Sequence, residues 1–163
     1  LSSYVESHGL TGVALRYFNL YGPEENHLPE THAIPRFIEQ IYNDKEVTVW
    51  GSGEHLRDYI YISDVVDAHL ATLDLVEKRP NEYHYFNLST EKPNSVIEVI
   101  RTIAKAMGKE PNIKHFEERP GDPLKLYADA SKAREQLGWQ SKVSFEEGIQ
   151  NTVSYFLDRF KNE

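Results

Sequence analysis

The chain has 163 residues, 39% of them hydrophobic, and its 18 Lys and Arg against 26 Asp and Glu give a net charge of -8. This length suffices for a buried core, and the acidic balance argues against nucleic acid or an anionic membrane as a partner. The absence of cysteine excludes disulfides, thiolate zinc sites and a cysteine nucleophile, so we expect a cytoplasmic protein. No apolar run approaches the roughly 18 residues of a membrane span.

The first residues predict the end of a helix, a buried strand and a turn. Leu1–His8 precede Gly9, a residue type common just after a helix. The apolar run Val13–Phe18 predicts a strand, and Tyr21–Pro23 predict the turn that ends it. Because the chain opens inside an element and its only methionine is Met107, we expect it to be part of a longer protein.

The middle of the chain predicts helices that alternate with short strands. Residues 24–31 read as a polar loop and 34–43 as a helix. Strands are predicted over 47–50, 57–62 and 85–88. Ser63 is the predicted N-cap of a helix over 64–77, since its hydroxyl can accept a free backbone N–H.

Capping boxes mark two later helices. Ser95 with Glu98 opens a helix that runs to Gly108, and Ser144 with Glu147 opens the last helix of the chain. Between them we expect a weak strand over 113–116, a loop over 119–123 and a helix over 131–137. The apolar stripe of the last helix consists of Ile149, Val153, Phe156 and Phe160. No internal repeat or linker indicates a second domain.

Motifs for independent catalysis are missing from the sequence. Gly51-Ser52-Gly53 begins like a dinucleotide-binding loop, but Leu56 stands where the third glycine is required. The chain has no Tyr-x-x-x-Lys, and its histidines are scattered without metal-ligand spacing. We therefore predict no catalytic residue and no metal ligand in this chain.

Three segments together carry a family resemblance. Residues 16–23 read RYFNLYGP, residues 50–59 read WGSGEHLRDY, and RPGD at 119–122 is followed by ADASKA at 128–133. In this order they resemble the extended short-chain dehydrogenases, the NAD-dependent epimerase/dehydratase family, and among them most nearly UDP-glucose 4-epimerase. The resemblance covers nearly the whole chain.

The resemblance implies an α/β fold, the C-terminal part of an extended Rossmann-type enzyme. Residues 1–23 would end the Rossmann half, and 24–163 would form the substrate-binding region. The NAD-binding half, with its glycine-rich loop and Tyr-x-x-x-Lys pair, would precede residue 1. The complete enzyme would be a homodimer that passes through a 4-keto sugar, with NAD as the hydride acceptor and this chain as the nucleotide-sugar-binding part.

The first segment implies two site residues at the carboxyl end of a strand, where ligands bind in doubly wound sheets. By resemblance, Phe18 lies against the nicotinamide end of NAD and Asn19 contacts the sugar nucleotide. The amide of Asn19 can both donate and accept hydrogen bonds. The alternative is that Asn19 only caps the turn before Gly22.

The second segment implies the pocket for the base. Thr48, Val49 and Trp50 would present main chain and an aromatic face, and stacking of an indole on a uracil is physically reasonable. His32 and Ala33 align with the other edge of the pocket, although the family pattern has asparagine in place of His32. The alternative is that Trp50 belongs to the core.

Arginines supply the expected clamp for the diphosphate. Guanidinium groups give fixed bidentate donors to phosphate, which suits Arg57 and Arg119. Asp122 would accept hydrogen bonds from the ribose hydroxyls. The alternatives are a surface ion pair of Arg57 with Asp58 or Asp64, and a plain turn at 120–122.

The base and the sugar stay open at this point. The sequences of 19–23 and 49–53 also resemble GDP-fucose synthase, and the first of them suits dTDP-glucose dehydratases. We favour a UDP-sugar, with a GDP- or dTDP-sugar enzyme of the same family as the alternative. A different class of function is a sugar-nucleotide-binding module without catalysis.

Overall fold

A computed structural model describes residues 1–25 and 32–162 and shows an α/β chain of two compact units. The first unit consists of Leu1–Leu20, Asp58–Lys92 and Tyr127–Val143, and the second of Tyr21–Arg57, Pro93–Leu126 and Ser144–Glu163. Both units are interleaved along the chain, because distant segments pair with each other. The boundary expected after residue 23 stays a prediction. Residues 26–31 of the predicted polar loop lie outside the described residues.

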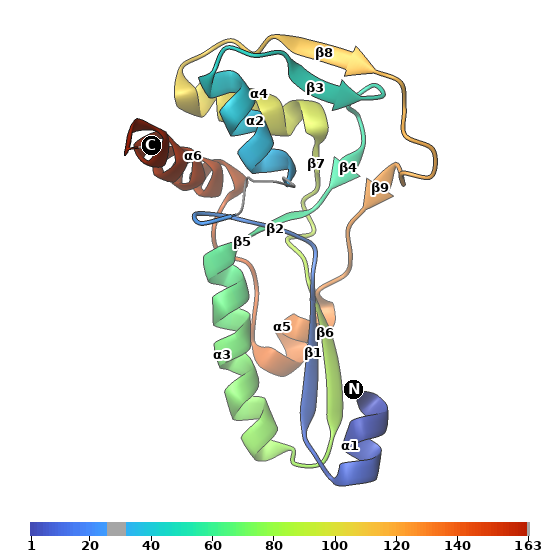
Figure 1. Cartoon of the computed structure of the whole chain (residues 1–163). Helices are drawn as coiled ribbons and strands as arrows, with labels where there is room; N and C mark the ends of the chain where they lie inside the picture. The colour runs from blue at the N-terminus through green and yellow to red at the C-terminus, as the bar shows by residue number, and fades with distance from the viewer. Residues whose placement is uncertain (26–31, 163) are drawn as a thin grey trace. The chain divides into compact units, whose positions relative to one another are not determined.

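The first unit is built on a parallel pair of strands. Strand β1 (Gly12–Tyr17) pairs with β6 (Tyr83–Leu88), so that Leu15 is opposite Phe86. Such a pair needs a crossover connection, and the helix α3 (Ile62–Lys78) lies within it. Figure 1 shows α3 and α5 (Ser131–Leu137) beside these strands, and both contact them. The short helix α1 (Ser2–His8) ends at Gly9 in the left-handed conformation, as predicted.

The core of the first unit lies between α3, α5 and one face of β6. Every second residue of β6 is buried, as expected for a strand with one covered face. The indole N–H of Trp139 donates to the backbone carbonyl of Asp64 at 2.7 Å. The buried cluster consists of Ile60, Val65, Ala68, Leu75, Phe86, Leu88, Ala130, Ala133 and Trp139.

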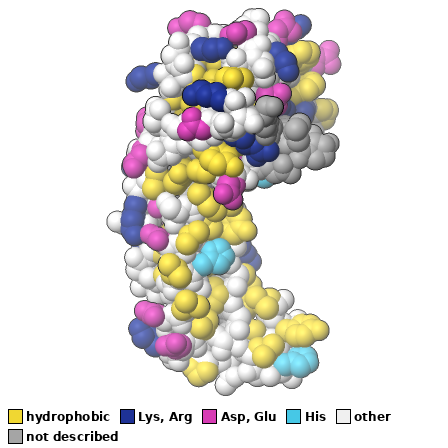
Figure 2. Space-filling view, turned by 60° about the vertical axis from the view of Figure 1, so that its left-hand side comes forward, with side chains coloured by type: hydrophobic (Ala, Val, Ile, Leu, Met, Phe, Trp, Pro, Cys, Tyr) yellow, Lys and Arg dark blue, Asp and Glu magenta, His cyan; other side chains and the backbone are white. Residues whose placement is uncertain are grey.

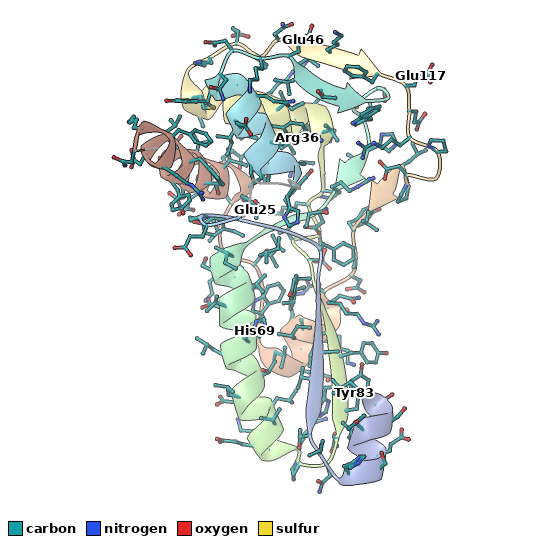
Figure 3. All side chains as sticks on the ribbon, in the orientation of Figure 1. Glu25, Arg36, Glu46, His69, Tyr83 and Glu117 are labelled. Carbon is teal, nitrogen blue, oxygen red and sulfur yellow. The ribbon has the colours of Figure 1, made fainter. Side chains whose placement is uncertain are left out.

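Helix α3 also carries apolar residues on its exposed side. Val66, Leu70 and Leu73 are 50%, 59% and 57% exposed and are spaced for one helix face. Figure 2 shows hydrophobic side chains gathered in the lower part of that view. His69, labelled in Figure 3, lies on the same helix and its Nδ1 is 2.9 Å from the carbonyl oxygen of Val65.

The second unit packs three helices together beside a parallel strand pair. Helices α2 (Ala33–Tyr42), α4 (Val96–Met107) and α6 (Phe145–Asn162) contact one another. Strand β3 (Val47–Trp50) pairs with β8 (Ile113–Phe116), and Figure 1 shows the two side by side. A small sheet orders the strands β7-β4-β9, with β7 at Asn94–Ser95, β4 at Leu56–Arg57 and β9 at Lys125–Leu126.

Local capping predictions are confirmed where the hydrogen bonds are local. Ser95 and Glu98 form the complete capping box, and Gly108 ends α4 in the left-handed conformation. At the start of α6, the Ser144 hydroxyl accepts the Glu147 N–H at 3.2 Å. Three of the four residues of the predicted stripe, Ile149, Val153 and Phe156, are buried.

Two predictions around residue 60 are wrong. The strand expected over 57–62 is two strands, β4 and β5 (Tyr59–Tyr61), because each pairs with a different partner: β4 with β7 and β9, and β5 with β2 (Asn19–Tyr21). Ser63 is not an N-cap. Helix α3 already begins at Ile62, and its N-cap residue is Tyr61, whose side chain makes no cap hydrogen bond.

Candidate functional site

Trp50 is a surface residue at the end of β3 and not part of the core. Residues alternate between the two faces of a strand, and Val47 and Val49 are both 0% exposed whereas Trp50 is 37% exposed. The side chain of Val49 therefore cannot face a ligand, and only its main chain remains available for the predicted role. The indole of Trp50 remains accessible.

Two side chains contact the indole ring of Trp50. The Phe116 ring, from the residue opposite Trp50 in the β3–β8 register, has its centroid 5.4 Å away. The guanidinium carbon of Arg119 lies 4.5 Å from the indole centroid, a distance typical of cation–π contacts. The residue predicted to stack on the base and a residue predicted to bind the diphosphate are thus direct neighbours.

Arg119 belongs to an exposed stretch between β8 and β9, which we name the 117–124 segment. It begins at Glu117, labelled in Figure 3, and all its residues are exposed. The Glu118 carboxylate lies 3.1 Å from Nε2 of the buried His55, on the stretch between β3 and β4. The segment therefore brings charged groups to the end of β3.

Arg57 is tied to the same segment. Its guanidinium donates to the carbonyl oxygens of Leu56 at 2.9 Å and Pro123 at 2.8 Å and forms an ion pair with Asp122. The Arg57 side chain is 13% exposed and that of Asp122 is 42% exposed. Arg57, predicted to bind the diphosphate, and Asp122, predicted to bind the ribose, thus bind each other.

Arg57 forms neither of the two alternative ion pairs, because each of those carboxylates accepts hydrogen bonds from another segment. Asp58 accepts the backbone N–H groups of Thr90 at 3.1 Å and Glu91 at 3.0 Å. Asp64 accepts the backbone N–H groups of Lys142 at 3.1 Å and Val143 at 3.2 Å. Burial raises the pKa of the Asp64 carboxyl group above its ordinary value.

Thr48 lies at the open edge of the β3–β8 pair. The N–H groups of Val47 and Gly51 donate toward β8, to Asn112 and Phe116. In a parallel ladder the intervening residues, Thr48 and Trp50, direct their backbone groups to the opposite edge. There, the amide oxygen of Gln40 accepts the Thr48 N–H at 3.4 Å, and the amide nitrogen donates to the Thr48 hydroxyl at 3.3 Å.

His32 and Ala33 lie at the start of α2. His32 occupies the N-cap position without a side-chain cap, and Ala33 is the first helical residue. Nδ1 of His32 is 2.6 Å from a carboxylate oxygen of Glu25, and the His32 side chain is 74% exposed. Burial raises the pKa of Glu25, and the hydrogen bond from His32 acts in the opposite direction. His32 is thus engaged by a carboxylate.

Phe18 and Asn19 lie in the first unit, whereas the other predicted site residues lie in the second. They follow the carboxyl end of β1, as predicted, and both are half-buried. The Phe18 N–H donates to the Leu88 carbonyl at 3.4 Å. The Asn19 backbone and side-chain N–H groups both donate to the Asp58 carbonyl, at 3.0 and 3.1 Å.

Gly53 packs closely against α4. Gly53 has φ of 81°, and a Cβ there would lie 2.6 Å from Cγ1 of Ile97 on α4. The Ile97 N–H donates to the Gly53 carbonyl at 3.2 Å. Gly53 therefore belongs to the contact between the end of β3 and α4.

No group of three or more His, Cys, Asp or Glu among residues 1–25 and 32–162 is arranged to hold a metal ion. No helix in those same ranges is both long and apolar enough to cross a membrane.

Sequence reasoning missed three residues that shape these sites: Gln40, Asp58 and Phe116. Asp58 stands in the RDY pattern, and from its position in the sequence it suggests only an ion pair with Arg57. Phe116 stands at the end of a predicted strand, as Trp50 does, and an aromatic at each strand end was a usable signal for the pair.

Comparison with known proteins identifies a single family. The model of the NAD dependent epimerase/dehydratase family matches residues 1–88, more than half of the chain. A UDP-glucuronate 4-epimerase of Thermodesulfobacterium geofontis is 34% identical over 158 residues, which cover 95% of this chain and 46% of the relative. The chain spans less than half the length of the curated relatives it matches.

Solved structures agree with this match. UDP-glucose 4-epimerase of Thermotoga maritima with UDP-glucose is 37% identical, with a TM-score of 0.85 over 98% of this chain and 51% of that protein. UDP-glucose 4-epimerase of Thermus thermophilus in complex with NAD is 33% identical, with a TM-score of 0.82 over 96% of this chain and 50% of that protein. These neighbours are Rossmann-type enzymes, which confirms the predicted fold class.

Proposed function

The chain belongs to the NAD-dependent epimerase/dehydratase family, and we propose that it is the nucleotide-sugar-binding part of a UDP-sugar 4-epimerase, similar to UDP-glucose 4-epimerase. One observation of the structure carries the proposal. The exposed indole of Trp50 contacts Arg119, and the same exposed segment holds Arg57 through Asp122. A flat aromatic surface beside two arginines suits a nucleotide diphosphate.

In this proposal Trp50 stacks on the base, and backbone groups at the edge of β3 form hydrogen bonds with the base. The backbone N–H and C=O of Trp50 point to the open edge of the strand pair, beside Thr48. A backbone donor and acceptor in fixed positions can pair with the edge of uracil. His32 and Ala33 are the proposed opposite edge of the pocket. Stacking contributes affinity for any base, so the hydrogen bonds at these edges supply the preference.

Arg57 and Arg119 bind the diphosphate in this proposal. Arg57 gives up its ion pair with Asp122, whereas Arg119 either keeps its contact with one face of Trp50 or gives it up. Once Arg57 binds phosphate, the Asp122 carboxylate becomes available to accept hydrogen bonds from ribose hydroxyls. In the bound state a phosphate replaces the Asp122 carboxylate beside Arg57.

Asn19 is the proposed contact to the sugar nucleotide in the first unit, and Phe18 is the proposed contact to the nicotinamide end of NAD. The family is NAD-dependent, and the neighbour from Thermus thermophilus was crystallised with NAD. This chain binds and orients the nucleotide sugar. The catalytic base and the site for the pyrophosphate of NAD come from an NAD-binding half outside it. We further propose a cytoplasmic homodimer for the complete enzyme, consistent with a chain without cysteine.

UDP is the favoured nucleotide because several relatives are named for UDP-sugars. The Thermodesulfobacterium relative is a UDP-glucuronate 4-epimerase, and the Thermotoga neighbour was solved with UDP-glucose. Which UDP-sugar this protein takes follows from groups around the sugar, of which Asn19 is the candidate in this chain.

Calorimetric titration with UDP, UDP-glucose and GDP tests the proposal. We expect UDP and UDP-glucose to bind more tightly than GDP, and the 163-residue chain alone to show no turnover of UDP-galactose and no tight NAD binding. A clear preference for GDP would reject the UDP-sugar assignment. Turnover by the purified chain would show that it carries its own catalytic base.

A further inference from the structure

Asp58 is a buried carboxylate, and both of its oxygens accept hydrogen bonds from one loop. It lies between β4 and β5 and is 0% exposed. One carboxylate oxygen accepts the backbone N–H of Thr90 at 3.1 Å and its hydroxyl at 2.7 Å. The other accepts the Glu91 N–H at 3.0 Å and the hydroxyl of Ser89. A buried charge with this many donors holds its position firmly.

The 89–91 loop is itself fixed to a third segment. The Ser89 hydroxyl lies 2.8 Å from the Ala128 carbonyl oxygen. The Glu91 carboxylate accepts the Ala130 N–H at 2.9 Å and forms an ion pair with Arg134 of α5. The side chain of Asp58 is therefore anchored to the end of β6 and, through it, to the start of α5.

The main chain of Asp58 makes a second kind of contact. Its carbonyl oxygen accepts both the backbone N–H of Asn19 at 3.0 Å and the side-chain amide N–H at 3.1 Å. These two bonds orient the Asn19 side chain. Within residues 1–25 and 32–162 one amide N–H is used, and the amide oxygen and the second N–H have no protein partner and can meet a ligand.

We propose that Asp58 is the positioning residue for Asn19: its carboxylate is fixed by the 89–91 loop, and its carbonyl oxygen holds the Asn19 amide in the orientation that meets the nucleotide sugar. The proposal rests on the proposed function for the ligand and on the described contacts for the positioning. It also explains why an acidic residue follows Arg57. The aspartate accepts hydrogen bonds from Asn19 and does not pair with Arg57.

Asp64 provides a matched control in the same unit. Its two carboxylate oxygens also accept two successive backbone N–H groups, from Lys142 and Val143. Its carbonyl oxygen also accepts a side-chain N–H, from the indole of Trp139 at 2.7 Å. Asp64 is 1% exposed. Asp64→Asn thus disturbs two successive backbone N–H donors, as Asp58→Asn does, but not the two hydroxyl donors that Asp58 has in addition, and only Asp58 contacts Asn19.

Nuclear magnetic resonance of the ¹⁵N-labelled chain tests the positioning without any ligand. In Asp58→Asn we expect the Asn19 side-chain amide signals to shift and their exchange with water to rise on the order of tenfold, the scale of one buried hydrogen bond. In Asp64→Asn the Asn19 signals should stay and the Trp139 indole signal should move. Unchanged Asn19 signals in Asp58→Asn, or equal changes in both variants, would overturn the proposal.

Ser89→Ala keeps the test decisive if Asp58→Asn fails to fold. It removes one hydroxyl donor from the Asp58 carboxylate and leaves every backbone contact to it in place. A smaller shift of the same Asn19 amide signals is expected. Asn19 signals that do not respond to Ser89→Ala would count against the anchored carboxylate.

A double-mutant cycle with UDP-glucose tests the link to binding. Asp58→Asn should weaken binding by about the same factor as Asn19→Ala, and the double variant should lose little more, because both remove one contact. Asp64→Asn should be additive with Asn19→Ala. Additive losses for Asp58 and Asn19 would overturn the positioning role. Absence of UDP-glucose binding in the wild-type chain would instead contradict the proposed function, while the Asn19 signals still decide the role of Asp58.

Discussion

The guanidinium of Arg119 covers a face of the Trp50 indole, with its carbon 4.5 Å from the ring centroid. A base that stacks on Trp50 therefore either uses the opposite face or displaces Arg119. In both cases Arg119 ends next to the nucleotide. In the proposed site this arrangement would couple the binding of the base to the binding of the diphosphate.

Arg119→Ala should weaken UDP binding by roughly 1.5 to 3 kcal/mol, the scale of a charge-assisted hydrogen bond. Arg119→Lys should recover part of the loss, because lysine keeps the charge without the bidentate geometry. Since Arg119 is exposed, the melting temperature should stay close to wild type. Calorimetric titration and thermal unfolding measure the two effects, and an unchanged affinity would assign Arg119 to the surface.

Arg57→Ala should lower both affinity and stability. The loss of affinity should again be roughly 1.5 to 3 kcal/mol. Unlike Arg119, Arg57 also donates to the Leu56 and Pro123 carbonyls and pairs with Asp122, so its removal loosens the 117–124 segment. The same two measurements on both variants separate the roles. A stability loss with unchanged UDP affinity would leave Arg57 as a purely structural residue.

Trp50→Ala should reduce the binding free energy of UDP and of UDP-glucose by the same amount, about 1 to 3 kcal/mol, because the lost contact is with the base that they share. The weak binding of GDP should fall by a similar factor, since stacking tolerates different bases. Trp50→Phe, which keeps an aromatic face, is the control and should retain most of the affinity. Competition titrations measure all three ligands. A loss confined to UDP-glucose would place Trp50 beside the sugar.

Gly53→Ala should destabilise the second unit for two reasons. Its φ of 81° is strained for alanine, and the new methyl group would lie 2.6 Å from a carbon of Ile97. Gly121→Ala is the matched control, because φ is 83° there but nothing lies within 4 Å of the added carbon. We expect about 1 kcal/mol for strain alone in Gly121→Ala and roughly 2 to 4 kcal/mol in Gly53→Ala. Equal losses in urea unfolding would mean that Ile97 moves aside.

Acid should remove the contribution of the capping box at α4. The hydrogen bond from the Ser95 backbone N–H holds the pKa of Glu98 below its ordinary value of 4.5. Because the folded-state pKa is depressed, the stabilisation is present above the unfolded-state pKa and is lost as the pH falls through the folded-state pKa. Wild type should therefore exceed Glu98→Gln in free energy of unfolding at neutral pH, and the difference should shrink in acid. The exposed Glu110→Gln is the control, and a difference independent of pH would contradict the assignment.

The sequence by itself determined the elements whose hydrogen bonds are local. The box of Ser95 and Glu98 and the left-handed Gly108 depend on residues a few positions apart, and so they could be read directly from the chain. The strand at 47–50 pairs with a distant strand, but it could also be read from the sequence, because Val47 and Val49 alternate with Thr48 and Trp50 and both valines are buried. The residue types for a nucleotide site, an aromatic and two arginines, were also visible in the sequence.

Only the tertiary structure decided which groups meet. Arg57 has two carboxylates near it in sequence, but its partner is Asp122, because the pairing of β4 with β9 brings that segment beside it. The apparent strand over 57–62 divides at Asp58, whose buried charge is satisfied by the 89–91 loop. Partners of this kind come from segments far apart in the chain. The local sequence shows which residues can form such bonds. The packing of distant strands determines which of them do.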